Sequence, residues 1–242
     1  MKRFATALIL FLFPAWLANR IVRLWGVRIE GKIGFSWVAC DHCTIEKGAC
    51  IQNFCYVRLP SLTMRRGARI KMFNRIKGSF TMEMEPDAVI NFASKITNTP
   101  ALKYRDTKFL LGEMAVLGVS TRVDMTGNVT IGAFSVFAGA GSELWTHSYY
   151  HSREVPKRFR IDGDIVVGKN VYIGSRCIIT AGVSIADNIS IGAGSVVSKS
   201  LEKSGLYVNQ PLRFLEFDPD EKIRTLEQIP DAPIDLVYRR KM

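Results

Sequence analysis

Aliphatic residues recur every six positions in the C-terminal third of the chain, from Ile165 to Leu201. One register consists of Val167, Ile173, Ile179, Ile185, Ile191 and Val197, and a second consists of Ile165, Val171, Cys177, Val183 and Ile189. A six-residue period fits neither an amphipathic helix nor a simple alternating strand. It predicts an all-β fold, a parallel β-helix in which each hexapeptide is a short strand with a corner.

The same period is present further toward the N-terminus. One set continues the C-terminal register, and another has a different phase: Val119, Met125, Ile131 and Phe137; and Val27, Ile33, Ala39, Ile45, Ile51 and Val57. Between Arg58 and Leu117 the registers break, which predicts irregular coils there. A solenoid grows by stacking and needs no second core, so one domain accounts for most of the chain.

Three parts of the chain follow from these patterns. We expect an apolar, membrane-associating helix over residues 1–26, a β-helix over 27–206 and a C-terminal extension over 207–242. Loops are expected to leave the stack near residues 99–112 and 143–163, where the repeat is interrupted.

The apolar N-terminal run Phe4–Phe13 is too short to span a bilayer, which takes about 20 residues. Pro14 interrupts it. We expect residues 1–25 to make peripheral membrane contact, with Trp16 and Trp25 at the depth of the headgroups. A cap on the open end of the β-helix is a second reading, and a cleaved signal peptide is a third.

The net charge of +11 suits an anionic membrane surface or a phosphate-bearing ligand such as coenzyme A. Basic residues concentrate in two places: Arg65, Arg66, Arg69, Lys71, Arg75 and Lys77; and Arg239, Arg240 and Lys241. A solvated charge run is the alternative for the first group. Nucleic acid is not expected as a partner, because no nucleic-acid motif or aromatic stacking surface accompanies these residues.

Five cysteines, an odd number without a paired framework, argue against a disulfide scaffold and favour a reducing compartment. Zinc is an alternative, with Cys40, His42, Cys43 and Cys50 as ligands. No second C-x-x-C follows at the spacing of a zinc site, so we expect small wall residues and no metal.

The stretch from Ile173 to Val197 resembles the hexapeptide-repeat acyltransferases. The resemblance implies that the β-helix is left-handed. Cys177 departs from the family, which usually has a smaller or hydroxyl residue there, but cysteine packs as a small hydrophobe.

His147 is the candidate catalytic residue. It lies where the clean repeat stops and a polar excursion begins, and histidine ordinarily titrates near neutrality, so it can accept a proton from a hydroxyl. The pair Thr146–His147 resembles the Thr-His pair of galactoside and maltose acetyltransferases. The other two histidines, His42 and His151, are expected to have no such role.

The same resemblance runs from Tyr172 to Arg213 and implies a site for acetyl-CoA. The residues that it places at this site are Tyr172, Ser175, Ala193, Ser198, Lys199 and Arg213. It places Ser175 and Ala193 at the pantetheine arm, Ser198 and Lys199 near the adenosine, and Arg213 at the phosphates. Tyr172 stands where those enzymes have Trp. The family also implies a homotrimer, with the cofactor between neighbouring chains.

An apolar N-terminus is absent from the galactoside and maltose enzymes but is frequent in acetyltransferases of surface-glycan assembly. We therefore expect an acetyl-CoA-dependent O-acetyltransferase that acts on a sugar of a bacterial surface polysaccharide, lipopolysaccharide or lipid-linked precursor. Its expected location is the cytoplasmic face of the inner membrane. The alternatives are an N-acetyltransferase of a nucleotide-linked amino sugar and a non-catalytic membrane-bound scaffold.

Overall fold

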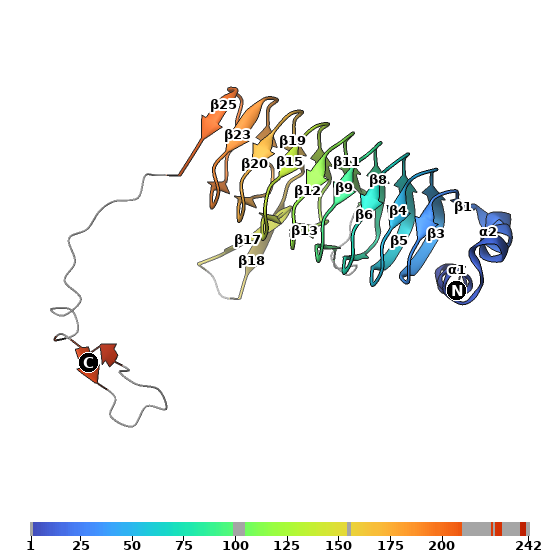
Figure 1. Cartoon of the computed structure of the whole chain (residues 1–242). Coiled ribbons are helices and arrows are strands. Elements are labelled where there is room, and N and C mark those ends of the chain that lie inside the picture. Colours follow the sequence, from blue (N-terminus) through green and yellow to red (C-terminus); the bar gives the residue numbers. More distant parts are fainter. Residues whose placement is uncertain are drawn as a thin grey trace. The chain divides into compact units, whose positions relative to one another are not determined.

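The computed structural model describes residues 2–98, 105–153, 156–209, 224, 226–228 and 238–240. The described residues form a parallel β-solenoid of about nine turns, with short helices at its N-terminal end (Figure 1). The expected left-handed parallel β-helix is therefore confirmed as the fold class.

The strands stack on three faces. Face I begins with the first parts of β3 (Trp37–Ile45) and β5 (Tyr56–Met64) and continues with β7 (Arg75–Lys77), β10 (Lys95–Thr97), β13 (Arg122–Asp124), β16 (Glu143–Leu144), β21 (Ile178–Ile179) and β24 (Val196–Val197). Face II begins with β1 (Val27–Ile29) and the second parts of β3 and β5, and continues with β8 (Phe80–Met84), β11 (Thr107–Leu111), β14 (Val129–Ile131), β19 (Ile165–Val167) and β22 (Ser184–Ile185).

Face III is a separate sheet. Its strands are β2 (Lys32–Ile33), β4 (Cys50–Ile51), β6 (Arg69–Ile70), β9 (Val89–Ile90), β12 (Val116–Leu117), β15 (Val136–Phe137), β20 (Tyr172–Ile173), β23 (Ile189–Ile191) and β25 (Gly205–Tyr207). The last strand, β25, pairs with β23 and so belongs to the stack.

The core is a column of aliphatic side chains inside the coils. Every residue of the two C-terminal registers is buried. Val119 is an exception to the N-terminal continuation of that register: it is only half-buried at a corner, whereas Leu117 and Val123 occupy the core. The six-residue rule therefore places most of the core correctly.

The coils between Arg58 and Leu117 are regular, contrary to the expectation. Ile51 pairs with Ile70, and Ile70 pairs with Ile90, so these coils contain 19 and 20 residues. Ile173 and Ile191 are 18 apart. One or two extra residues at a corner change the phase of the sequence without disturbing the stack, which explains the apparent irregularity.

The two expected excursions differ. Thr107–Leu111 is strand β11 within face II, so the second half of the loop expected near 99–112 is part of a coil. The second excursion is a hairpin of β17 (His147–His151) and β18 (Arg158–Asp162), which leaves the stack after face I. The chain returns at β19, which pairs with β14.

The N-terminal segment contains two helices rather than one. Helix α1 (Lys2–Leu12) and helix α2 (Ala15–Val22) are separated at Pro14, which cannot continue a helix, and the short helix η1 (Arg23–Trp25) follows. No helix among the described residues is long and apolar enough to cross a membrane.

Helix α1 packs on the first coil. Ala7 is fully buried, the rings of Phe4 and Trp37 lie 5.6 Å apart, and the indole N–H of Trp25 donates a hydrogen bond to Thr6. The guanidinium of Arg3 forms an ion pair with Asp41 of β3. The helix therefore covers the open end of the core.

Residues 210–242 form a separate unit, in which β26 (Leu226–Gln228) pairs with β27 (Tyr238–Arg240) in antiparallel orientation.

Candidate active site

His147 is held by a carboxylate on the neighbouring coil. Its Nδ1 atom lies 2.8 Å from Oδ2 of Asp124, the last residue of β13. An ionised carboxylate can only accept hydrogen bonds, so Nδ1 carries the proton and Nε2 of the neutral imidazole has a free lone pair. This tautomer is the one that a general base requires.

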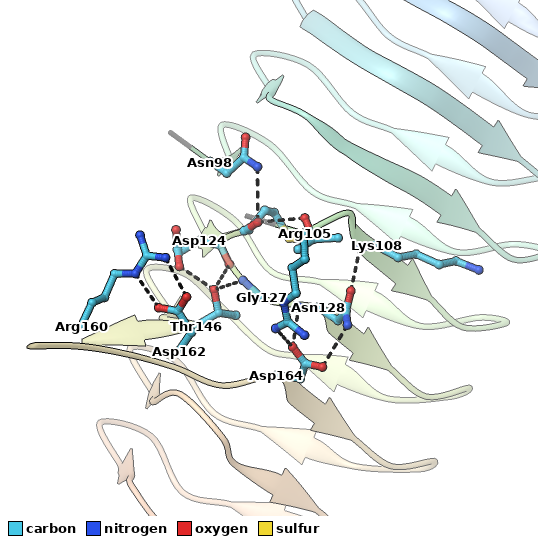
Figure 2. A network of polar contacts seen from close by, with 12 residues as sticks. Asn98, Arg105, Lys108, Asp124, Gly127, Asn128, Thr146, Arg160, Asp162 and Asp164 are labelled. Carbon is cyan, nitrogen blue, oxygen red and sulfur yellow. Dashed lines mark hydrogen bonds and ion pairs between the residues drawn. The ribbon is translucent and has the colours of Figure 1, made fainter. Parts of the chain in front are cut away.

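Asp124 is itself fixed by hydroxyl groups. The side chain of Thr126 donates to Oδ1, and that of Thr146 contacts Oδ2 (Figure 2). The Thr146 hydroxyl also accepts from the backbone N–H of Gly127. Only 9% of the Asp124 side chain is exposed, so few conformations other than the one facing His147 are open to it.

Two aromatic rings flank the imidazole. The rings of Trp145 and Tyr149 both meet His147 edge-on, at centroid distances of 6.4 and 5.8 Å. The indole N–H of Trp145 donates to Glu143, which fixes that ring. The imidazole therefore has a defined orientation as well as a defined tautomer.

A pocket of about 160 Å³ opens beside this pair. Its lining residues are Lys95, Thr97, Asn98, Arg122, Val123, Asp124, Trp145 and His147. It lies on the outer surface of face I, where alternate side chains point away from the core. A small polar acceptor in this pocket would lie beside Nε2 of His147.

A second polar cluster supports the hairpin where it rejoins the stack. Asp164 accepts hydrogen bonds from the backbone and side chain of Asn128 and pairs with Arg105 (Figure 2). Burial acts to raise the pKa of Asp164, but these hydrogen bonds and the guanidinium outweigh it and lower the pKa below its ordinary value. The ionised carboxylate is therefore part of the folded structure.

The residues that the resemblance assigns to acetyl-CoA are only partly brought together. Ser175 and Ala193 lie one above the other at the corner between faces III and I, because Ile173 pairs with Ile191 in the preceding strands. Ser198 and Lys199 line a hollow with Asn209 beyond the end of β24. Tyr172 is exposed on face III, and Arg213 lies outside the described residues.

The corner at Ser175 and Ala193 has room for an extended ligand. Gly139 and Gly174 precede these residues in the stack, and a Cβ atom at either glycine would come within 2.5 Å of the corner above it. Among the described residues, no hydrogen bond uses the backbone N–H of Ser175 or Ala193. Two free donors on an unobstructed corner fit the amide-rich pantetheine arm.

His147 and this corner lie on opposite edges of face I of one chain. Ser175 precedes β21, whereas His147 follows β16, and these two strands are paired. The width of the face therefore separates the candidate base from the candidate donor site.

The other chemical candidates do not gather. His151 is exposed on the hairpin opposite Arg158, and His42 is exposed on β3. Cys40 and Cys43 are buried, and a hydrogen bond to Cys40 together with burial raises the pKa of the Cys43 thiol. Cys50 lies on another face, and no group of three or more potential metal ligands occurs in the described part of the chain.

The family comparison agrees with this picture. Residues 164–199 match the model of the bacterial transferase hexapeptide (six repeats). This segment is a run of bacterial transferase hexapeptide repeats. The hexapeptide repeats coincide with the 18-residue coils, and the recognised resemblance is confirmed.

Three curated relatives are acetyltransferases by name. A "Probable macrolide acetyltransferase" of Lysinibacillus sphaericus is 30% identical over 126 residues, 49% of this chain and 66% of the relative. The galactoside O-acetyltransferase of Escherichia coli K12 is 43% identical over 51 residues, 21% and 25% of the two chains. The "Putative colanic acid biosynthesis acetyltransferase WcaF" of the same strain is 35% identical over 95 residues, 39% and 50%. Each match leaves about a third or more of the relative unmatched.

Asp124 is the functional residue that the sequence did not reveal. It follows the core residue Val123 in an ordinary coil, and only the pairing of β13 with β16 brings it beside His147. The run Asp124–Asn128, which is rich in polar residues at a corner, was the available signal.

Proposed function

We propose that this protein is an acetyl-CoA-dependent O-acetyltransferase that modifies a sugar hydroxyl of a bacterial surface glycan or its lipid-linked precursor. The observation that carries the proposal is the Asp124–His147 pair beside an open pocket. The names of the relatives support the acetyl group, and the free corner at Ser175 and Ala193 supports the donor.

The chemistry requires one proton transfer in each direction. Nε2 of His147 takes the proton of the sugar hydroxyl as that oxygen attacks the thioester carbonyl carbon. Collapse of the tetrahedral intermediate breaks the carbon–sulfur bond and releases coenzyme A, whose thiolate receives the proton from the imidazolium. Asp124 holds the imidazole and stabilises its transient positive charge.

We propose that the active unit is a trimer with a shared site. His147 and the corner at Ser175 and Ala193 face different edges of one chain, so a neighbouring chain would have to supply one of them. A closed ring of heterologous contacts repeats this arrangement three times. The exposed apolar side chain of Val196 on face I is suited to such a contact.

We propose peripheral attachment to the cytoplasmic face of the inner membrane. The N-terminal helices cap the first coil, yet several of their large apolar side chains are exposed: Phe4, Leu12, Phe13, Trp16 and Leu24. The ring of Phe11 meets Phe35, and the exposed rings of Phe35, Phe54 and Phe73 follow one another along a corner of the first coils. Such an apolar surface fits the lipid boundary.

Acetylation of defined acceptors tests the proposed function. Purified protein, acetyl-CoA and a panel of neutral, acidic and amino sugars are incubated, and thiol release and product mass are measured. Removal of the new acetyl group by mild alkali identifies an ester. An alkali-stable acetyl on an amino sugar would assign the protein to the N-acetyltransferases instead, and the absence of both coenzyme A binding and turnover would favour a scaffold.

A further inference from the structure

Face I carries a ladder of basic side chains that leads to His147. Tyr56, Arg75, Lys95 and Arg122 are directly paired on four consecutive coils, and Arg58 and Lys77 form a second pair beside them. The residues between them on each strand are buried, so these side chains share the outer surface. We call Arg58, Arg75, Lys77, Lys95 and Arg122 the basic ladder.

The ladder lacks counter-charges. Of its five members, only Arg122 has a carboxylate within ion-pair distance among the described residues, that of Glu143 at 4.0 Å. Elsewhere the described cations have partners: Arg65 pairs with Glu46, and Lys108 with Glu83. Like charges that are directly opposite on adjacent strands repel each other. The fold therefore keeps an unfavourable arrangement on the face that contains His147.

The basic cluster read from the sequence is only partly this ladder. Arg65 and Arg66 bind the carboxylate of Glu46 at another corner. Arg69 lies on face III. The three-dimensional grouping depends on the stack and brings in Lys95 and Arg122 from later coils.

Hollows bound the ladder at both ends. Lys95 and Arg122 line the pocket beside His147. At the other end, Trp37, Tyr56 and Arg58 line a hollow of about 570 Å³ against helix α1. Adjacent strands are about 4.8 Å apart, so the path from Tyr56 to Arg122 is roughly 14 Å, the scale of a short run of sugar units.

We propose that face I binds the acceptor through its negative charge and so presents a hydroxyl to His147. The acidic groups are carboxylates of acidic sugars in the glycan or the diphosphate of its carrier. Arg75, Lys95 and Arg122 would form charge-assisted hydrogen bonds with them, and the exposed ring of Tyr56 would pack against a sugar. This inference rests on the proposed acetyl transfer to a glycan.

Calorimetric titration of the full chain without an acetyl donor tests the inference. The probes are a galacturonic acid hexamer, the neutral maltohexaose and UDP-N-acetylglucosamine. We expect an anionic probe to bind in low salt and to weaken as salt is added, while maltohexaose binds at least tenfold more weakly. Binding of the hexamer assigns the charge to acidic sugars, and binding of the nucleotide sugar alone assigns it to a diphosphate.

Matched variants locate the site. Arg75→Gln with Lys95→Gln should lower affinity for the anionic probe at least tenfold, whereas Lys47→Gln with Arg69→Gln removes the same charge from other surfaces and should change it less than threefold. Equal effects of the two pairs, or no binding of either anion, would overturn the inference. Because no transfer is measured, acetylation of a neutral sugar by the same protein would leave the proposed function intact.

Discussion

Nδ1 of His147 lies 2.8 Å from Oδ2 of Asp124, although 23 residues separate the two in the chain. The stacking of β13 on β16 brings them together, and the hydroxyls of Thr126 and Thr146 fix the carboxylate. A β-helix thus builds an aspartate–histidine pair from successive coils without a long-range loop. The pair prepares the imidazole before an acceptor binds.

Replacement of His147 by alanine should lower turnover about 10²–10⁴-fold, the usual contribution of a positioned general base. The side chain is only 20% exposed but lies at the edge of the core, so the melting temperature should change little. His151→Ala, on the exposed part of the hairpin, is the matched control and should retain most of the activity. Near-normal turnover of His147→Ala would remove this residue from the mechanism.

Asp124→Asn tests the positioning role of the carboxylate. An asparagine can offer its N–H to Nδ1, which would put the imidazole proton on Nε2 and prevent it from acting as a base. We expect kcat to fall about 100-fold while KM for the acceptor changes less than threefold. Thr126→Val, which removes one of the hydrogen bonds to Asp124, should have a much smaller effect. A change confined to KM would assign Asp124 to acceptor binding.

Hybrid oligomers test whether neighbouring chains share a site. His147→Ala removes the base, and Ala193→Trp fills the open corner, so each variant alone should be inactive. If a trimer combines these residues from different chains, random mixing of the two variants restores about one quarter of the sites. Light scattering of the mixture should report three chains. Inactive hybrids that are shown to form trimers would contradict a shared site.

The hydrophobic period was sufficient to predict the solenoid, because each coil needs the same inward residues. It also placed Ser175 and Ala193 correctly, one coil apart on a corner. The regularity between Arg58 and Leu117 escaped prediction because corners tolerate extra residues without losing strand register. A fixed six-residue comparison is sensitive to such insertions, whereas hydrogen bonding between strands is not.

Asp124 and the basic ladder could not be predicted for a related reason. The sequence distance between stacked residues varies: Lys95 pairs with Arg75 and with Arg122, 20 residues before it and 27 residues after it. Side chains that touch across coils therefore show no fixed spacing. His147 was easier to identify because the excursion it begins interrupts the repeat.

Acid should weaken the base of the hairpin at Asp164. Hydrogen bonds from Asn128 and the charge of Arg105 keep the pKa of this carboxyl lower in the folded than in the unfolded chain. Its stabilising contribution is therefore present at neutral pH and is lost as pH falls through the folded-state pKa, below about 4. Asp164→Asn should lower the melting temperature at pH 7, and its difference from the wild type should shrink toward pH 3. A difference that is the same at both pH values would contradict this assignment.

Exposed apolar residues of the N-terminal helices give the sharpest test of membrane attachment. Deletion of the whole segment would also uncover the core, because Ala7 and Thr6 are buried against the first coil. Trp16 and Leu24 are 71% and 83% exposed, so Trp16→Ser with Leu24→Ser should leave the melting temperature unchanged. Sedimentation with vesicles that contain phosphatidylglycerol should show binding by the wild type, weakened by salt, and at least tenfold weaker binding by this variant. Leu206→Ser with Val208→Ser, at the last coil, removes similar exposed apolar surface and should bind like the wild type. Equal binding by all three proteins would leave the helices with the capping role alone.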